Sequence, residues 1–183
     1  MQPMTVPLFA TLLGASAWAV REDLLEHRIP NRLTGSLLCF GLSLQLALGG
    51  WSALGEAALG AVVGLAVLLP LYLLRATGAG DVKLLAALGA LLGPYWILVA
   101  GVYSLIAGGV LALGYLLAGT LRAAIAPTGV PWPLRIQYGY ERAQQLRRER
   151  FPYALAIATG AVSAAAQRGD LRAVFDYLSG VGA

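Results

Sequence analysis

The sequence predicts an all-helical membrane protein in which about six transmembrane helices form a single domain over residues 1–183. Three observations support this fold class. The chain is 58% hydrophobic and only 12% charged, with a mean hydropathy of +0.72, which is more apolar than soluble domains are. Apolar runs of about 17 to 25 residues, the length that crosses a bilayer, recur along the chain. Basic residues gather in the connections between these runs.

Glycine, proline and charged residues separate the apolar runs and fix the expected helices. The first run has no positive segment before it and a charged cluster after it, so we interpret it as a retained anchor and not a cleaved signal peptide. The fourth run is short, spanning about 16 Å, because Gly93-Pro94 interrupts it. The expected helices cover approximately residues 4–20, 32–49, 53–74, 82–92, 95–121 and 152–167, with a loop over 122–150.

The basic residues orient this predicted bundle. The connections at 21–32, 75–83 and 122–150 hold all of the 13 Lys and Arg residues except Arg168 and Arg172. Since cytoplasmic loops of membrane proteins carry an excess of Lys and Arg, these three connections are expected on the cytoplasmic side. The net charge of +4 then follows from membrane topology. It predicts contact with membrane lipid and gives no reason to expect a nucleic-acid partner.

Two aspartates, Asp23 and Asp81, are expected at the same cytoplasmic face. Asp23 follows the first apolar run, and Asp81 stands in Gly78-Ala79-Gly80-Asp81-Val82-Lys83 before the fourth. The second and third helices run in opposite directions across the membrane, so they return the chain to the side where it began. An ionisable carboxylate between apolar spans is costly and indicates a functional site.

Two carboxylates in one site can share the work of peptide hydrolysis. Their repulsion and partial desolvation separate their proton affinities, so that one is protonated while the other is ionised near neutral pH. The ionised carboxylate takes a proton from the attacking water, and the protonated one polarises the carbonyl and assists the leaving amine. The sequence does not assign these roles to Asp23 or Asp81 individually, because such a titration belongs to the pair.

Residues near the aspartates allow further interpretations. Gly78 and Gly80 permit positive φ and the close approach of a second backbone, as an extended substrate requires. Asp81 can also act as the cap of the fourth helix, which does not exclude catalysis. Glu22 and Glu26 are the other carboxylates nearby. On a helix Glu22 points about 100° away from its neighbour, and we expect Glu26 to pair with a surface arginine.

No metal site or cofactor is expected from the sequence. A structural zinc requires three or four Cys and His ligands, whereas the chain has one cysteine, Cys39, and one histidine, His27. The glycines around Asp81 match neither of the common nucleotide-binding spacings. We interpret Cys39 as a small buried hydrophobic residue.

The ordered motifs of the chain resemble those of a known family. Asp23 is followed by Ile29-Pro30-Asn31, then by the stretch from Gly78 to Gly89, and finally by Pro152-Tyr153-Ala154. This order resembles the type IV prepilin peptidases, the GxGD aspartic proteases of the membrane. The similarity is greatest to the short CpaA/TadV-like forms linked to Flp or Tad pili. It implies that Asp23 and Asp81 are the catalytic pair.

The resemblance also implies a substrate and a location. The substrate would be a prepilin or pseudopilin precursor, from which a short basic leader is removed ahead of its hydrophobic helix. The enzyme would lie in the bacterial cytoplasmic (inner) membrane with its active site facing the cytoplasm. Larger members of the family also methylate the new N-terminus and carry paired cysteines, and we expect neither feature here. The loop at 122–150 departs from the family and is interpreted as a membrane-surface segment.

Two other functions fit paired membrane carboxylates. A proton- or cation-coupled transporter would use Asp23 and Asp81 as carriers of charge. The predicted helices show no inverted repeat with matching broken helices, which many transporters have. A structural subunit without catalysis would leave the position of Asp81 unexplained. We therefore expect an aspartic endopeptidase, with the transporter as the alternative.

Overall fold

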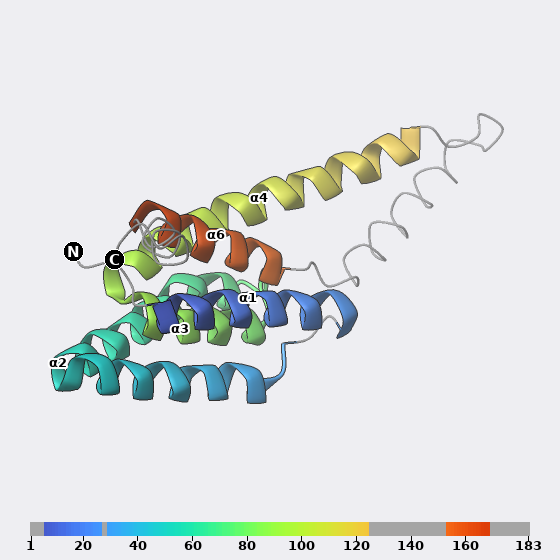
Figure 1. Cartoon of the computed structure of the whole chain (residues 1–183). Coiled ribbons are helices and arrows are strands. Elements are labelled where there is room, and N and C mark those ends of the chain that lie inside the picture. The colour runs from blue at the N-terminus through green and yellow to red at the C-terminus, as the bar shows by residue number, and fades with distance from the viewer. Residues whose placement is uncertain (1–5, 27–28, 125–152, 169–183) are drawn as a thin grey trace, which may run out of the picture. The chain divides into compact units, whose positions relative to one another are not determined.

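The computed structural model describes residues 6–26, 29–124 and 153–168. Within them the chain forms α1 (Val6–Glu26), α2 (Asn31–Leu73), α3 (Ala79–Leu92), α4 (Pro94–Ala124) and α6 (Tyr153–Arg168), as Figure 1 shows. The prediction of an all-helical fold is confirmed for this part of the chain. The predicted loop at 122–150 lies outside the described residues, apart from its first three, which continue α4.

The chain divides into two compact units, Met1–Ala107 with Pro152–Ala183 and Gly108–Phe151. The second contains the C-terminal part of α4 and is otherwise outside the described residues. The candidate site lies in the first unit, which holds α1, α2, α3, the start of α4 and α6. The expectation of a single domain over 1–183 stays a prediction.

The helices carry apolar side chains on their outer surfaces. In the described chain two segments are long and apolar enough to cross a membrane, α2 and Pro94–Gly114 of α4. Large hydrophobic side chains recur on the exposed side of both, where they suit contact with lipid; examples are Leu59, Val62, Leu65, Leu98, Val102 and Ile106. These apolar helices indicate a membrane protein, whereas the count of about six spans stays a prediction.

Helix α1 is longer than the sequence predicts. The expected end at residue 20 is wrong, because the backbone stays helical to Glu26. Charged residues such as Arg21 and Glu22 end the apolar run, but they are good helix formers and continue the helix. Leu12, Ala19 and Asp23 are all buried on its inner face. Asp23 therefore belongs to the last turns of a helix and not to a connection.

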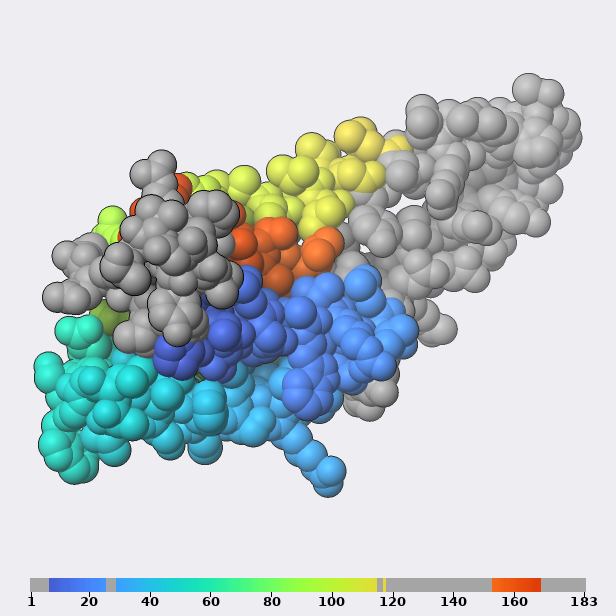
Figure 2. Space-filling view, in the orientation of Figure 1, coloured from blue at the N-terminus to red at the C-terminus, as the bar shows by residue number. Residues whose placement is uncertain are grey.

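Helix α2 consists of two arms that meet at Gly50. This residue has a φ of 67° and a ψ of −158° inside the otherwise helical span, a backbone region that glycine adopts without steric cost. The arms, residues 31–49 and 51–73, agree with the expected helices at 32–49 and 53–74. Figure 2 shows α1 side by side with the first arm on one face of the molecule.

Helix α3 is the central element of the first unit. Lys83 is the one exposed residue between Asp81 and Leu92, and all the others are buried. At one end the Lys83 Nζ donates to Asn31 Oδ1 at 2.9 Å, and at the other Gln45 Nε2 donates to the Leu91 carbonyl at 3.3 Å. The contact residue on α2 and its partner on α3 both have higher sequence numbers at the second contact than at the first, so the first arm of α2 runs parallel to α3.

The second arm of α2 runs antiparallel to α3 and touches its backbone. A Cβ placed on Gly60 would lie 2.9 Å from Gly93 Cα and even closer to the carbonyl oxygen of Gly89. A Cβ on Gly64 would lie 3.0 Å from the carbonyl carbon of Leu85. Gly60 and Gly64 are four residues apart, as are Gly89 and Gly93, and small residues at this spacing allow membrane helices to pack closely.

Two short connections fix the ends of α3. The second arm of α2 ends in a Schellman motif, in which the N–H of Ala76 donates to the Leu71 carbonyl and that of Arg75 to the Tyr72 carbonyl. Arg75 takes the left-handed position of this motif with a φ of 58°. At the other end Gly93 has a φ of 81°, and α4 follows directly.

Helix α6 completes the packing around α3. Its C-terminal Arg168 donates to the Leu92 carbonyl at 3.2 Å, so α6 and α3 end together. Gly160 lies directly against α4, where a Cβ would come within 2.8 Å of the Ser104 backbone nitrogen. Figure 1 shows α1 between α6 and the first arm of α2.

We predict that Gly60→Ala destabilises the protein, because the added methyl overlaps the backbone of α3. Overpacking of this kind costs about 1–3 kcal/mol. Gly55→Ala is the matched control, since a Cβ at Gly55 meets nothing within 4 Å on the same arm. Thermal unfolding in detergent should give a lower midpoint for the first variant only. Equal midpoints for both variants would contradict the close contact of α2 and α3.

Candidate active site

The Asp23 carboxylate lies in the last turns of α1 and faces the start of α6. Its side chain is 6% exposed. Its Oδ2 accepts a hydrogen bond from the backbone N–H of Ala154, at 3.0 Å. Ala154 belongs to the first turn of α6, whose N–H groups have no partner within the helix. The positive end of the α6 dipole therefore stabilises negative charge on Asp23.

The Asp81 carboxylate lies in the first turn of α3. Asp81 is 9% exposed, and its Oδ2 accepts the backbone N–H of Gly78 at 2.9 Å. Its own N–H donates to the Gly78 carbonyl at 3.2 Å. The sequence-based alternative, that Asp81 caps this helix, is thus present in the structure. The cap fixes one carboxylate oxygen and sets the orientation of the side chain.

The first turn of α6 brings the two aspartates to one place. The Ala154 N–H donates to Asp23, and α6 packs along α3 with the C-terminal ends of the two helices together, so Asp81 in the first turn of α3 lies at the same end of the bundle. The buried Tyr153 hydroxyl is 3.5 Å from the carbonyl oxygen of Ser104 on α4. Helix α6 also packs against both α1 and α3. The predicted meeting of the two carboxylates at one end of the bundle agrees with this geometry.

Gly78 and Gly80 are required by close contacts and not by an unusual backbone. Neither residue adopts the positive φ that glycine permits, because Gly50 and Gly93 are the glycines with positive φ in the described chain. A Cβ on Gly78 would lie 3.2 Å from the Asp81 Oδ2. The expected close approach is present at Gly80, which we describe next.

The segment that follows α1 packs against the first turn of α3. A Cβ on Gly80 would lie 3.0 Å from Ile29 Cβ and 3.5 Å from the Ile29 carbonyl oxygen. Two residues further on, Asn31 Oδ1 accepts the hydrogen bond from Lys83. Asp81 therefore stands between two contacts with the same segment. Sequence spacing alone does not reveal this pairing, because 52 residues separate Asn31 from Lys83.

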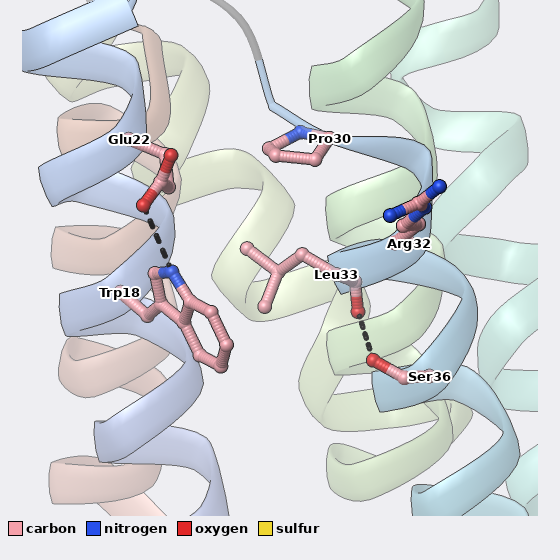
Figure 3. Close-up of a pocket in the computed structure, with 6 residues that line it drawn as sticks. All are labelled: Trp18, Glu22, Pro30, Arg32, Leu33 and Ser36. Carbon is pink, nitrogen blue, oxygen red and sulfur yellow. Dashed lines mark hydrogen bonds between the residues drawn. The ribbon is translucent and has the colours of Figure 1, made fainter.

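Glu22 faces away from the site. Its Oε1 accepts hydrogen bonds from Trp18 Nε1 and from the guanidinium of Arg21, both at 3.0 Å. Figure 3 shows Glu22 and Trp18 on α1 across from Pro30, which directly precedes α2, and Leu33 of its first arm. They line a shallow groove of about 400 Å³. Glu22 is thus held in the groove, while Asp23 faces α6.

Among the carboxylates whose side chains the structure describes, Asp23 and Asp81 are the buried ones. Each is buried, and each has one oxygen held by a backbone N–H, so neither carboxylate can turn freely. Buried carboxylates in this setting can accept and donate protons to a bound substrate. Within the described residues no three His, Cys, Asp or Glu side chains gather in a way that would hold a metal ion.

Comparisons with known proteins identify similar sequences. Residues 8–113 match the model of the type IV leader peptidase family. The chain is 41% identical over 102 residues to a protein of Aeromonas salmonicida named prepilin leader peptidase/N-methyltransferase. An Aeromonas hydrophila protein of the same name is equally similar. Each match covers 52% of this chain and 35% of the relative.

The chain thus aligns with about a third of the length of the relatives it matches. No solved structure matches it. The family match includes Asp23, Asp81 and the segment at 29–31, and it covers more than half of the chain. On this evidence the chain belongs to the type IV leader peptidase family.

Proposed function

We propose that this protein is a membrane aspartic endopeptidase that removes the short basic leader from type IV prepilins, of the Flp or Tad kind. The observation that carries the proposal is the pair of buried carboxylates at the first turn of α6, Asp23 from α1 and Asp81 from α3. The family match and the names of the relatives support the same substrate class.

The proposed mechanism uses both aspartates without a metal. One carboxylate takes a proton from a water molecule as the water attacks the scissile carbonyl. The other donates its proton to the carbonyl oxygen, which gives a tetrahedral intermediate with two hydroxyl groups. As this intermediate collapses, the first carboxyl group gives the proton that it took from water to the departing amine, and the second takes its proton back from a hydroxyl group. The peptide bond breaks between the carbonyl carbon and the nitrogen, and the leader leaves with a new carboxylate. The backbone N–H groups of Ala154 and Gly78 hold the carboxylates in position for these transfers.

We further propose that the chain crosses the bacterial inner membrane several times and cuts at its cytoplasmic face. The distribution of Lys and Arg supports this orientation, since the connections after α1 and before α3 are basic. A substrate with a positively charged leader would then retain the leader on the cytoplasmic side. Surrounding lipid is the expected environment for the exposed apolar side chains.

A proton-coupled transporter remains the second candidate for a buried carboxylate pair. It would need an open route past the aspartates to both sides of the membrane. At the other end of α3, Leu88, Leu91 and Ala90 are completely buried in the packed interior. This close packing of side chains favours the peptidase, which needs a route to the aspartates from only one side of the membrane.

We predict that Asp23→Asn and Asp81→Asn each abolish cleavage. The amide keeps the shape of the side chain but cannot exchange the proton, so turnover should fall about 100-fold or more. The assay is the mass of a prepilin precursor after incubation with purified protein in lipid. Glu22→Gln serves as the control and should keep most activity, because Glu22 faces the groove. Wild-type turnover in either Asp variant would remove that residue from the mechanism.

We predict that Gly80→Ala lowers cleavage by about ten-fold, because the methyl meets Ile29 and shifts the first turn of α3 together with Asp81. Gly35→Ala on α2 is the matched control, since a Cβ there has no neighbour within 4 Å. Initial rates on the same precursor give the comparison. An unchanged rate for the Gly80 variant would show that the contact does not position Asp81.

We predict that cleavage continues in the presence of a metal chelator and leaves the new N-terminal amine unmethylated. Cys39 and His27 together are too few for the ligands of a structural zinc. Product masses with and without S-adenosylmethionine report both properties. A loss of activity that zinc restores, or a mass gain of one methyl group, would count against this prediction.

A further inference from the structure

The exposed side chain of Lys83 has a specific partner across the helix pair. From Asp81 to Leu92, Lys83 is the one residue of α3 that is not buried. Its Nζ lies 2.9 Å from the Asn31 Oδ1, at the first residue of α2. Long side chains at exposed positions lose rotamer freedom when they are held in one geometry. The exposed hydrogen bond between Lys83 and Asn31 is therefore expected to fix the relative position of the two segments more than it raises the free energy of unfolding.

The contact lies close to a reacting group. Residues two apart on a helix leave it about 200° apart, so Lys83 and Asp81 leave α3 on different sides. Gly80 is three residues before Lys83 and therefore lies on the same face of the helix, where it packs against Ile29. The segment at 29–31 thus touches the first turn of α3 at two points, one before Asp81 and one after it.

We infer that Asn31 and Lys83 are positioning residues that set the location of Asp81 relative to Asp23. This inference rests on the proposed peptidase function. The segment 29–31 follows the end of α1 closely, so the contact links the helix of Asp23 to the helix of Asp81. Neither side chain exchanges a proton with the substrate. Their role is to hold the first turn of α3 at the distance that both carboxylates need for one water and one carbonyl.

A displacement of about 1 Å between reacting groups can lower turnover by up to about 100-fold. Loss of the Asn31–Lys83 contact should therefore lower kcat and leave KM within about two-fold, since substrate binding is not changed. The midpoint of thermal unfolding should stay nearly constant. A purely structural residue would instead lower the midpoint and the amount of active protein together.

The test is a double-mutant cycle on the full chain in lipid, with a prepilin precursor as substrate. Asn31→Ala and Lys83→Met should each lower kcat about ten-fold. The double variant should be no worse than either single variant, because both remove the same contact. Asn31→Asp should restore activity, since a carboxylate accepts from the Lys83 ammonium in the same position.

Gln45→Ala is the matched control for this cycle. Gln45 joins the same two helices by a hydrogen bond to the Leu91 carbonyl, at the end away from the aspartates. Gln45→Ala should keep kcat within about two-fold of the wild-type value if the effect on kcat depends on a contact close to Asp81. Equal losses in the Gln45 and Asn31 variants would overturn the inference, as would multiplicative losses in the double variant or no loss in either single variant.

The same assay separates this inference from the proposed function. Asp81→Asn reports on the peptidase itself, and the Asn31–Lys83 cycle reports on positioning. Active wild type, inactive Asp81→Asn and an unaffected cycle would overturn the inference alone. A wild type that cleaves no prepilin precursor would overturn the proposed function, and the positioning role would fall with it.

Discussion

The hydrogen bond from the Ala154 N–H to Asp23 joins the last turns of α1 to the first turn of α6, and the arrangement of the site depends on it. A buried carboxylate is costly unless it is hydrogen-bonded, and the start of a helix supplies both a free N–H and a favourable dipole. Helix α6 also packs along α3, whose first turn carries Asp81. One short stretch of α6 therefore organises carboxylates that are 58 residues apart in the sequence.

The position of Asp81 depends in turn on how closely the surrounding backbones pack. Gly60 allows the second arm of α2 to touch α3, and Gly80 allows Ile29 to reach the first turn of α3. Side chains larger than glycine would separate these elements. Glycines thus set how closely α2 packs against the buried helix α3. The Gly78 cap and the segment at 29–31 hold the first turn of α3. Close backbone contacts and hydrogen bonds therefore fix the place of Asp81 in the structure.

Much of this arrangement follows from local sequence, and some of it does not. Apolar runs, together with the glycines that interrupt them at Gly50 and Gly93, predict the helices of the described chain, because helix formation and termination depend on residues that are close in sequence. Hydropathy does not predict the true end of α1, because it reports the polarity of side chains and not the conformation of the backbone. The role of Ala154 leaves no signal, since a backbone N–H is common to every residue except proline. The contact of Asn31 with Lys83 depends on how α2 and α3 pack, which no spacing encodes.

The central claim is that Asp23 and Asp81 act as one pair, and the pH dependence of kcat/KM tests it most directly. Two carboxylates that share a site titrate in two macroscopic steps, and catalysis requires the state with one proton. We predict a bell-shaped dependence of kcat/KM on pH for cleavage of a prepilin precursor by the wild-type protein in lipid. A profile with a single ionisation and a flat plateau beyond it would show that only one carboxylate takes part, and would contradict the account.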